Sequence, residues 1–198
     1  MQLFSEKINM DLPDCDISYF PNLYSIETAE GYFQSLKNSI PWQQDKIKVF
    51  GKIYNQPRLT ALFADNLNSY SYSGLTMHPH PFTGDLIHIK KLVEKTVDIK
   101  FTTCLLNYYR DGKDSNGWHS DDEKELGMNP MIASVSFGAE RFFHLRNKAD
   151  KTQKHKILLE NGSLLLMKGE TQHFWQHQVP KTSKPIGGRI NLTFRILQ

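Results

Sequence analysis

The chain has 198 residues, of which 39% are hydrophobic and 23% are charged, and its formal net charge is +3. This length suits one ordinary domain, and the composition argues against a disordered chain. No apolar run reaches the roughly 18 residues of a membrane-spanning helix, and residues 1–16 are too acidic and too weakly apolar for a signal peptide. Cys15 and Cys104 lack CxxC spacing, which excludes a disulfide framework and a cysteine zinc knuckle. We therefore expect a protein of a reducing compartment that is neither secreted nor membrane-embedded.

Two helices are predicted in the first half of the chain. Apolar residues recur at every third or fourth position between Ser25 and Pro41, which predicts a helix there. Ser25 can cap its start and Pro41 ends it. A second apolar stripe predicts a helix over residues 84–97. Residues 47–53 and 68–73 lie in a region rich in Tyr, Gly and Pro, which predicts short strands or loops there.

After residue 101 the pattern changes to short strand-like runs separated by Gly, Asn, Asp and Lys. These runs are residues 101–109, 131–137, 141–145, 155–159, 163–167, 174–178 and 189–196. Several short strands after two helices predict a mainly β fold, a sandwich or jelly roll with helices flanking one face.

The last predicted strand has two unlike faces. From Arg189 to Arg195 its odd-numbered residues are polar and its even-numbered residues are apolar, which places two guanidinium groups on one side. An edge strand that faces water would produce this pattern. A strand that lines a polar cavity and holds an anion would produce it equally well.

A histidine and a carboxylate lie two residues apart at His119 and Asp121. On an extended backbone both side chains point the same way. Together they supply two ligands of the 2-His-1-carboxylate triad, which binds non-haem Fe(II) and leaves positions open for a cosubstrate and O₂. The same spacing is common in surface loops. His173 and His177 are the candidates for the third ligand, and their H-x₃-H spacing also occurs in zinc sites, although no HExxH glutamate accompanies it.

The two arginines of the last strand add a second feature. Arg189 and Arg195 follow His177 in the chain, and a guanidinium is the natural partner of a carboxylate. A metal triad beside an arginine-lined strand describes a site for a 2-oxo dicarboxylic acid. Its keto-acid end would chelate the metal, and its far carboxylate would meet an arginine.

These motifs, in this order and spacing, resemble the AlkB-type Fe(II)/2-oxoglutarate-dependent dioxygenases, which repair alkylated nucleobases. The matching segments are residues 49–52, 72–75, 106–109, 119–123, 134–138, 162–165 and 189–195. The resemblance covers roughly residues 49–197. Phe50-Gly51 together with the run from His119 to Glu123 is more similar to the duplex-acting, eukaryotic-type branch than to the founding bacterial enzyme.

The resemblance implies a role for each matching residue. It implies that His119, Asp121 and His177 bind iron. It also implies that Arg195 binds the far carboxylate of 2-oxoglutarate. The residues implied to complete that pocket are Asn107, Tyr109, Arg189 and Asn191.

The resemblance also implies contacts to a nucleic acid. Tyr72, with Ser73 beside it, matches the position that stacks on the extruded base, and Asp122 and Glu123 match polar positions near that base. Phe50 matches an aromatic wedge that fills the gap left by the flipped nucleotide. Flipping is required because the reacting methyl group lies on the Watson–Crick edge and is unreachable in a paired duplex.

Six basic residues and one acidic residue fall within residues 141–156. Such a cluster is often a solvated hairpin, and it can also contact phosphates. The resemblance to a DNA-gripping loop here is one of composition alone.

Together these features predict a single domain over residues 1–198: a double-stranded β-helix (jelly roll) core over about 101–198, with a helical buttress and a nucleotide-recognition lid in about 1–100. The predicted function is oxidative demethylation of N1-methyladenine and N3-methylcytosine in DNA, using Fe(II), 2-oxoglutarate and O₂ and releasing formaldehyde, succinate and CO₂. Alternatives are the same chemistry on RNA, protein or lipid, and a nucleic-acid-binding module without catalysis. We expect a monomer with no membrane partner, cytoplasmic in a bacterium or nuclear in a eukaryote.

Overall fold

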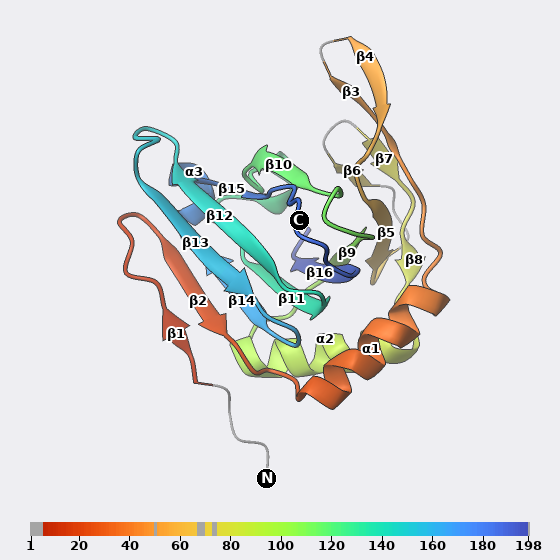
Figure 1. Ribbon diagram of the computed structural model, residues 1–198. Coiled ribbons are helices and arrows are strands. Elements are labelled where there is room, and N and C mark those ends of the chain that lie inside the picture. Colours follow the sequence, from red (N-terminus) through yellow and green to blue (C-terminus); the bar gives the residue numbers. More distant parts are fainter. Residues whose placement is uncertain (1–5, 50, 67–69, 73–74, 198) are drawn as a thin grey trace.

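The computed structural model describes residues 6–49, 51–66, 70–72 and 75–197. Two β-sheets pack face to face, and two helices cover the outer face of the larger sheet (Figure 1). Between the sheets lies one apolar cluster, and between the larger sheet and the helices lies another. This arrangement confirms the predicted mainly β, jelly-roll class with flanking helices.

The larger sheet runs through the centre of the molecule. In the described part of the chain it has eight strands in the spatial order β1-β2-β14-β11-β16-β9-β5-β8. In that order the strands are Ile8–Asn9, Asp16–Phe20, Leu164–Lys168, Ile132–Gly138, Arg189–Arg195, Thr103–Tyr109, Leu59–Ala64 and His80–Pro81. Its neighbours are antiparallel except for β5 and β8, which are parallel.

The smaller sheet has the order β10-β15-β12-β13 among the described residues. In that order its strands are Asn116–His119, Trp175–Val179, Arg141–Asn147 and Lys154–Leu159. Two hairpins stand apart from the sheets: β3 and β4 (Lys46–Val49 and Lys52–Asn55), and β6 and β7 (Tyr70–Tyr72 and Leu75–Met77). The β3–β4 hairpin extends away from the body of the molecule (Figure 1). Two short helical turns, η1 (Lys124–Leu126) and α3 (Thr171–Phe174), complete the described elements.

Both predicted helices are confirmed. Helix α1 spans Ile26–Ser39, and the Ser25 hydroxyl accepts a hydrogen bond from the Thr28 N–H at 3.2 Å, as an N-cap should. Helix α2 spans Gly84–Val97. No helix in the described residues combines the length and apolar character needed to cross a bilayer.

The position of strand β16 in the sheet shows what its polar and apolar faces contact. It pairs with β11 on one side and β9 on the other, so it lies in the middle of the larger sheet, and all of its residues are buried. Its apolar residues Ile190, Leu192 and Phe194 pack in the cluster beneath the helices. Its polar residues therefore face the space between the two sheets. Of the two alternatives that the sequence left open, the structure excludes an edge strand that faces water and supports a strand that lines a polar cavity.

Five strands differ from the sequence-based expectation. Strands β1, β2, β5 and β8 join the larger sheet although they come from the first hundred residues, and β10 was not predicted as a strand. Phe174 ends α3 and does not begin the following strand. Short strands of this kind are stabilised by their sheet neighbours, and pairing partners that are far away in the chain leave little trace in local periodicity.

Gly138, at the end of β11, offers a test of this packing. Its φ is +86°, and a Cβ atom there would lie 2.5 Å from the Gly188 carbonyl oxygen and 2.7 Å from Phe33 Cδ2. Gly138→Ala should lower the free energy of unfolding by about 2 kcal/mol or more. Gly31→Ala is the control: it lies within α1 with nothing within 4 Å, and it should raise that free energy by about 1 kcal/mol. Urea unfolding would measure both, and equal effects would contradict the packing described.

Candidate active site

His119 and His177 face one another across two paired strands. They are partners in the antiparallel register of β10 and β15, and their ring centroids are 4.2 Å apart. Along β15 alternate side chains turn inward, so His177 is buried while Gln176 and Gln178 on either side are partly exposed. The strand pairing therefore brings together two imidazoles that are far apart in the chain.

Asp121 lies just beyond the end of β10 and is held from two sides. Its backbone N–H donates to Gln172 Oε1 at 2.9 Å. Arg195 Nη2 donates to its Oδ2 at 2.8 Å, and the side chains of this ion pair are 2% and 5% exposed. Burial opposes ionisation of Asp121, but the Arg195 charge and the two imidazoles together hold the pKa of its carboxyl far below the usual range. Asp121 is therefore a carboxylate.

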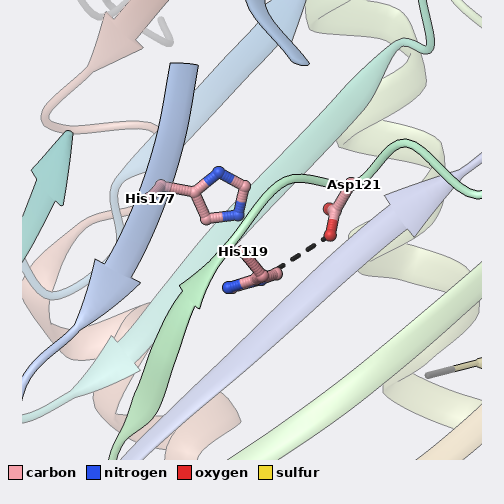
Figure 2. Close-up of side chains that lie close together, drawn as sticks. All are labelled: His119, Asp121 and His177. Atoms are coloured by element: carbon pink, nitrogen blue, oxygen red, sulfur yellow. Dashed lines mark ion pairs between the residues drawn. The ribbon is translucent and has the colours of Figure 1, made fainter. Parts of the chain in front are cut away.

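The three side chains form a donor set for a metal ion. Their candidate ligand atoms all lie within 4.8 Å of one another, and His119 Nε2 is 3.7 Å from Asp121 Oδ1. Figure 2 shows the three side chains close together, with a dashed line between His119 and Asp121. Asp121 Oδ1 is buried without a hydrogen-bond partner among the described residues, which is costly unless a ligand satisfies it. Two imidazoles and one carboxylate form the facial set typical of non-haem Fe(II), so these residues fit the iron that the sequence implies.

The protonation states of the histidines agree with metal binding. Burial, reinforced by His119, lowers the pKa of His177 to about 3, and burial also lowers the pKa of His119. Both rings are therefore neutral near pH 7, the form in which imidazole binds metals. His119 Nδ1 is 2.8 Å from the Gly117 carbonyl oxygen, so we assign the proton to Nδ1. Nε2 is then unprotonated, accepts a hydrogen bond from Asn116 Nδ2 at 3.2 Å, and is the nitrogen that can bind a metal.

A cavity between the two sheets continues from this donor set. The polar face of β16 and part of β9 form its wall. All five residues predicted to bind the cosubstrate line this cavity together with the histidines and Asp121, namely Asn107, Tyr109, Arg189, Asn191 and Arg195. Asn191 is fixed in the wall, because its Nδ2 donates to Ser134 Oγ at 2.7 Å and its Oδ1 accepts from Thr193 Oγ1 at 3.1 Å.

Arg189 is a buried cation with unused donors. It is 1% exposed, and its Nη2 donates to Ser136 Oγ at 2.9 Å. Its Nε and Nη1 are buried without an acceptor in the described part of the chain, and the guanidinium carbon lies 5.3 Å from the centroid of the Tyr109 ring. Burial lowers the pKa of Arg189 to about 10, so it remains charged at neutral pH. Unsatisfied guanidinium donors in a cavity suit a ligand carboxylate.

The two arginines of β16 mark different ends of the cavity. Arg195 contacts Asp121, whereas Arg189 begins the strand six residues earlier, which corresponds to roughly 20 Å between their Cα atoms. The resemblance to the AlkB-type enzymes implied that Arg195 binds the far carboxylate of the cosubstrate. In the structure Arg195 is engaged by a candidate metal ligand, and Arg189 is the arginine at the opposite end.

The residues expected to contact a base are only partly described. Phe50 and Ser73 lie outside the described residues, and so does the Tyr72 side chain, although the Tyr72 backbone ends β6. Asp122 lies at the surface, where its Oδ2 is 3.1 Å from Lys148 Nζ. Glu123 is partly buried, and burial together with the Asp121 charge raises the pKa of its carboxyl.

The other candidate for the third metal ligand lies elsewhere. His173 is exposed on α3, and its Nε2 is 2.8 Å from Asn129 Oδ1. The structure therefore brings His177 into the donor set and leaves His173 outside it.

Two kinds of supporting residue were missed from the sequence. Gln172 is buried on α3, where Oε1 accepts the Asp121 N–H, and nothing in its local pattern distinguishes it from a surface glutamine. Ser134 and Ser136 support Asn191 and Arg189 from the neighbouring strand β11. Their alternation with Val135 and Phe137 is a visible signal, because it gives β11 one polar and one apolar face, as in β16.

The chain matches the model of the 2OG-Fe(II) oxygenase superfamily over residues 16–195. It is 42% identical over 184 residues to "Alpha-ketoglutarate-dependent dioxygenase alkB homolog 3" of Bos taurus, which covers 88% of this chain and 64% of that protein. It is 36% identical over 193 residues to "DNA oxidative demethylase ALKBH2" of Bos taurus, covering 92% and 68%. A solved structure described as "The structure of OsALKBH1" is similar in fold, with a TM-score of 0.64 and 16% identity over 96% of this chain and all of that one.

The chain therefore belongs to the 2OG-Fe(II) oxygenase superfamily, and its relatives are AlkB-type dioxygenases, as the motifs predicted. Membership of this family implies Fe(II), 2-oxoglutarate and O₂, and the donor set formed by the two histidines and Asp121 fits the iron. The chain spans 64% of the length of the alkB homolog 3 relative from Bos taurus.

Removing Arg195 should expose the cost of the buried Asp121 charge. Arg195→Met leaves that carboxylate unpaired and should lower the free energy of unfolding by about 3 kcal/mol, and adding Asp121→Asn should recover most of the loss. Because folding lowers the pKa of Asp121, the contribution of the pair is present above the ordinary value of 3.8 and is lost as the pH falls towards the folded value. Urea unfolding at pH 7 therefore measures it in full.

Lys168→Met is the matched control for this prediction, because it breaks an ion pair with Asp16 whose side chains are 38% and 51% exposed. Such pairs contribute less than about 1 kcal/mol. An Arg195→Met variant no less stable than the Lys168→Met variant would contradict a buried pair at Asp121.

Proposed function

We propose that this protein is an Fe(II)- and 2-oxoglutarate-dependent demethylase that acts on N1-methyladenine and N3-methylcytosine in DNA. One observation carries the proposal: the His119, Asp121 and His177 donor set and the partly unsatisfied Arg189 guanidinium line one buried cavity. A molecule that chelates a metal through a keto acid and presents a second carboxylate would satisfy both. 2-Oxoglutarate has these two groups.

His119, Asp121 and His177 would hold the iron, which when bound activates O₂ to oxidise an N-methyl group that is then released as formaldehyde. The surrounding residues prepare these ligands. Arg195 keeps Asp121 ionised and occupies only Oδ2, so Oδ1 remains available. The Gly117 carbonyl accepts the His119 Nδ1 proton and so orients the ring.

Arg189 would bind the far carboxylate of 2-oxoglutarate, the role that the resemblance implied for Arg195. Tyr109 lies beside the guanidinium, and Ser136 holds one of its nitrogens. Apolar side chains such as Leu159 and Met167 complete the cavity lining and limit the water in contact with the bound anion, which strengthens its attraction to the guanidinium.

Methylated DNA is the proposed substrate because of the chain's charge and its relatives. Of the six basic residues within 141–156, Arg141 is buried, and the other five lie on β12, β13 and the turn between them. Strand β12 pairs directly with the strand that carries His177. One relative bears the name DNA oxidative demethylase. Positive charge beside an active-site strand suits the phosphates of a nucleic acid. Asp122 and Glu123 would favour a cationic methylated base over its neutral parent.

The central test is formaldehyde release from a methylated DNA oligonucleotide in the presence of Fe(II) and 2-oxoglutarate. His119→Ala, Asp121→Ala and His177→Ala should each reduce it by more than about 100-fold, because loss of a ligand weakens the metal site. His173→Ala is the control. It replaces an exposed histidine four residues before His177 and should leave the rate unchanged.

EDTA should abolish the activity and added Fe(II) should restore it. A methylated RNA oligonucleotide of the same sequence and an unmethylated DNA oligonucleotide serve as comparison substrates. Faster turnover of the methylated RNA would redirect the proposal to RNA, and a ligand variant with parental activity would overturn the metal site.

Arg189→Met should raise the KM for 2-oxoglutarate by about tenfold or more, with a smaller effect on kcat. It removes charge-assisted contacts of roughly 1.5–3 kcal/mol to the far carboxylate, while leaving the metal ligands in place. Succinate release as a function of 2-oxoglutarate concentration measures it. An unchanged KM would return the far carboxylate to Arg195.

A further inference from the structure

Arg141 is a second buried arginine beside Tyr109. It begins β12 and is 4% exposed. Its guanidinium carbon lies 5.7 Å from the centroid of the Tyr109 ring, while that of Arg189 lies 5.3 Å from the same centroid. One phenol ring is therefore in contact with two guanidinium groups, and only Arg189 lines the cavity.

Arg141 is fixed in place by backbone carbonyl groups from two loops. It donates to the carbonyl oxygens of Asp111 at 3.3 Å and Asp114 at 3.0 Å, in the turn between β9 and β10. It also donates to the carbonyl oxygen of Pro180, directly after β15. Since Tyr109 is the last residue of β9, Arg141 ties the segments on both sides of the cavity end to the ring that faces Arg189.

Arg141 forms no ion pair with a carboxylate of the described residues. The Asp114 carboxylate, in the turn that Arg141 contacts, is engaged by Arg110 through contacts of 2.7 and 2.9 Å. The acceptors that the described residues offer to Arg141 and Arg189 are backbone carbonyls and a serine hydroxyl. Two buried positive charges with neutral acceptors create a positive potential at this end of the cavity. The pKa values agree, because Arg141 adds to the effect of burial in lowering the pKa of Arg189.

We propose that Arg141 is a positioning residue for the cosubstrate, which makes the cavity selective for 2-oxo acids that carry a second carboxylate. It holds Tyr109 against Arg189 and adds positive charge behind it. A 2-oxo acid without the second carboxylate gains nothing from either effect. The inference rests on the proposed function, in which Arg189 receives the far carboxylate of 2-oxoglutarate.

The experiment compares two ligands of the Mn²⁺-loaded protein by calorimetry: 2-oxoglutarate, and 2-oxovalerate, which has the same chain length but ends in a methyl group. Arg141→Gln should raise the Kd of 2-oxoglutarate about tenfold, equivalent to roughly 1.4 kcal/mol, and should leave the Kd of 2-oxovalerate unchanged. Lys113→Gln is the control. It removes an exposed positive charge from the same turn between β9 and β10 that Arg141 contacts, and it should alter neither Kd by more than about twofold, because water screens an exposed charge.

Arg141→Lys covers the case in which the glutamine variant does not fold. It keeps the charge but cannot reach three carbonyls and stack on the ring, and it should reduce the selectivity for 2-oxoglutarate by about threefold. Equal weakening of both ligands would reduce Arg141 to a general folding role and overturn the inference, and so would an unchanged selectivity.

Arg189→Gln separates this failure from failure of the proposed function. If Arg189→Gln weakens the binding of 2-oxoglutarate and neither Arg141 variant changes the selectivity, the inference about Arg141 is wrong. The proposed binding of the far carboxylate by Arg189 is then still supported. If Arg189→Gln leaves the Kd of 2-oxoglutarate unchanged, the far carboxylate is bound elsewhere, and both the proposed placement and the inference are wrong.

Discussion

The ion pair between Asp121 and Arg195 joins the two sheets at the point where the metal donor set forms. Removing a carboxylate from water is costly, and a nearby guanidinium offsets that cost only when its geometry is good. Here Arg195 Nε and Nη2 both donate to Oδ2 of Asp121, and Oδ1 stays buried without a hydrogen bond from the described residues. This one ion pair thus keeps the carboxylate charged and leaves it one oxygen for a metal ion.

This arrangement requires a strand with polar residues in the middle of a hydrophobic fold. Strand β16 meets that requirement, because its apolar face packs under α1 and α2 while its polar face lines the cavity between the sheets. The neighbouring strand β11 supplies hydrogen-bond acceptors to this face, because Ser136 accepts from Arg189 and Ser134 accepts from Asn191. The helices therefore serve the site indirectly, since they let a central strand bury one face and devote the other to ligands.

Considering the described residues, the cavity has polar groups without hydrogen-bond partners at both ends. Asp121 Oδ1 lies at one end, and two nitrogens of Arg189 lie at the other. Buried polar atoms without partners destabilise a fold, and a ligand that satisfies them stabilises the folded state in proportion to its affinity. A metal ion and a dicarboxylate would thus add stability as they bind, which couples the occupancy of the site to the rigidity of the two sheets around it.

Local spacing was enough to predict several parts of this protein. The Ser25 cap and the apolar stripe predicted α1, and the parity of His119 and Asp121 predicted two ligands on one side of the chain. The alternation in β16 predicted two unlike faces but not their surroundings, because an edge strand and a central strand share the same pattern.

Contacts between distant segments settled the rest. Arg189 and Arg195 are equivalent in the sequence pattern, and only the tertiary structure shows that Asp121 lies beside Arg195. The contacts of Gln172 and Arg141 could not be predicted from the sequence, because their hydrogen-bond partners are far away in the chain. Periodicity along one segment records which side chains share a face, whereas the register between strands decides what that face meets.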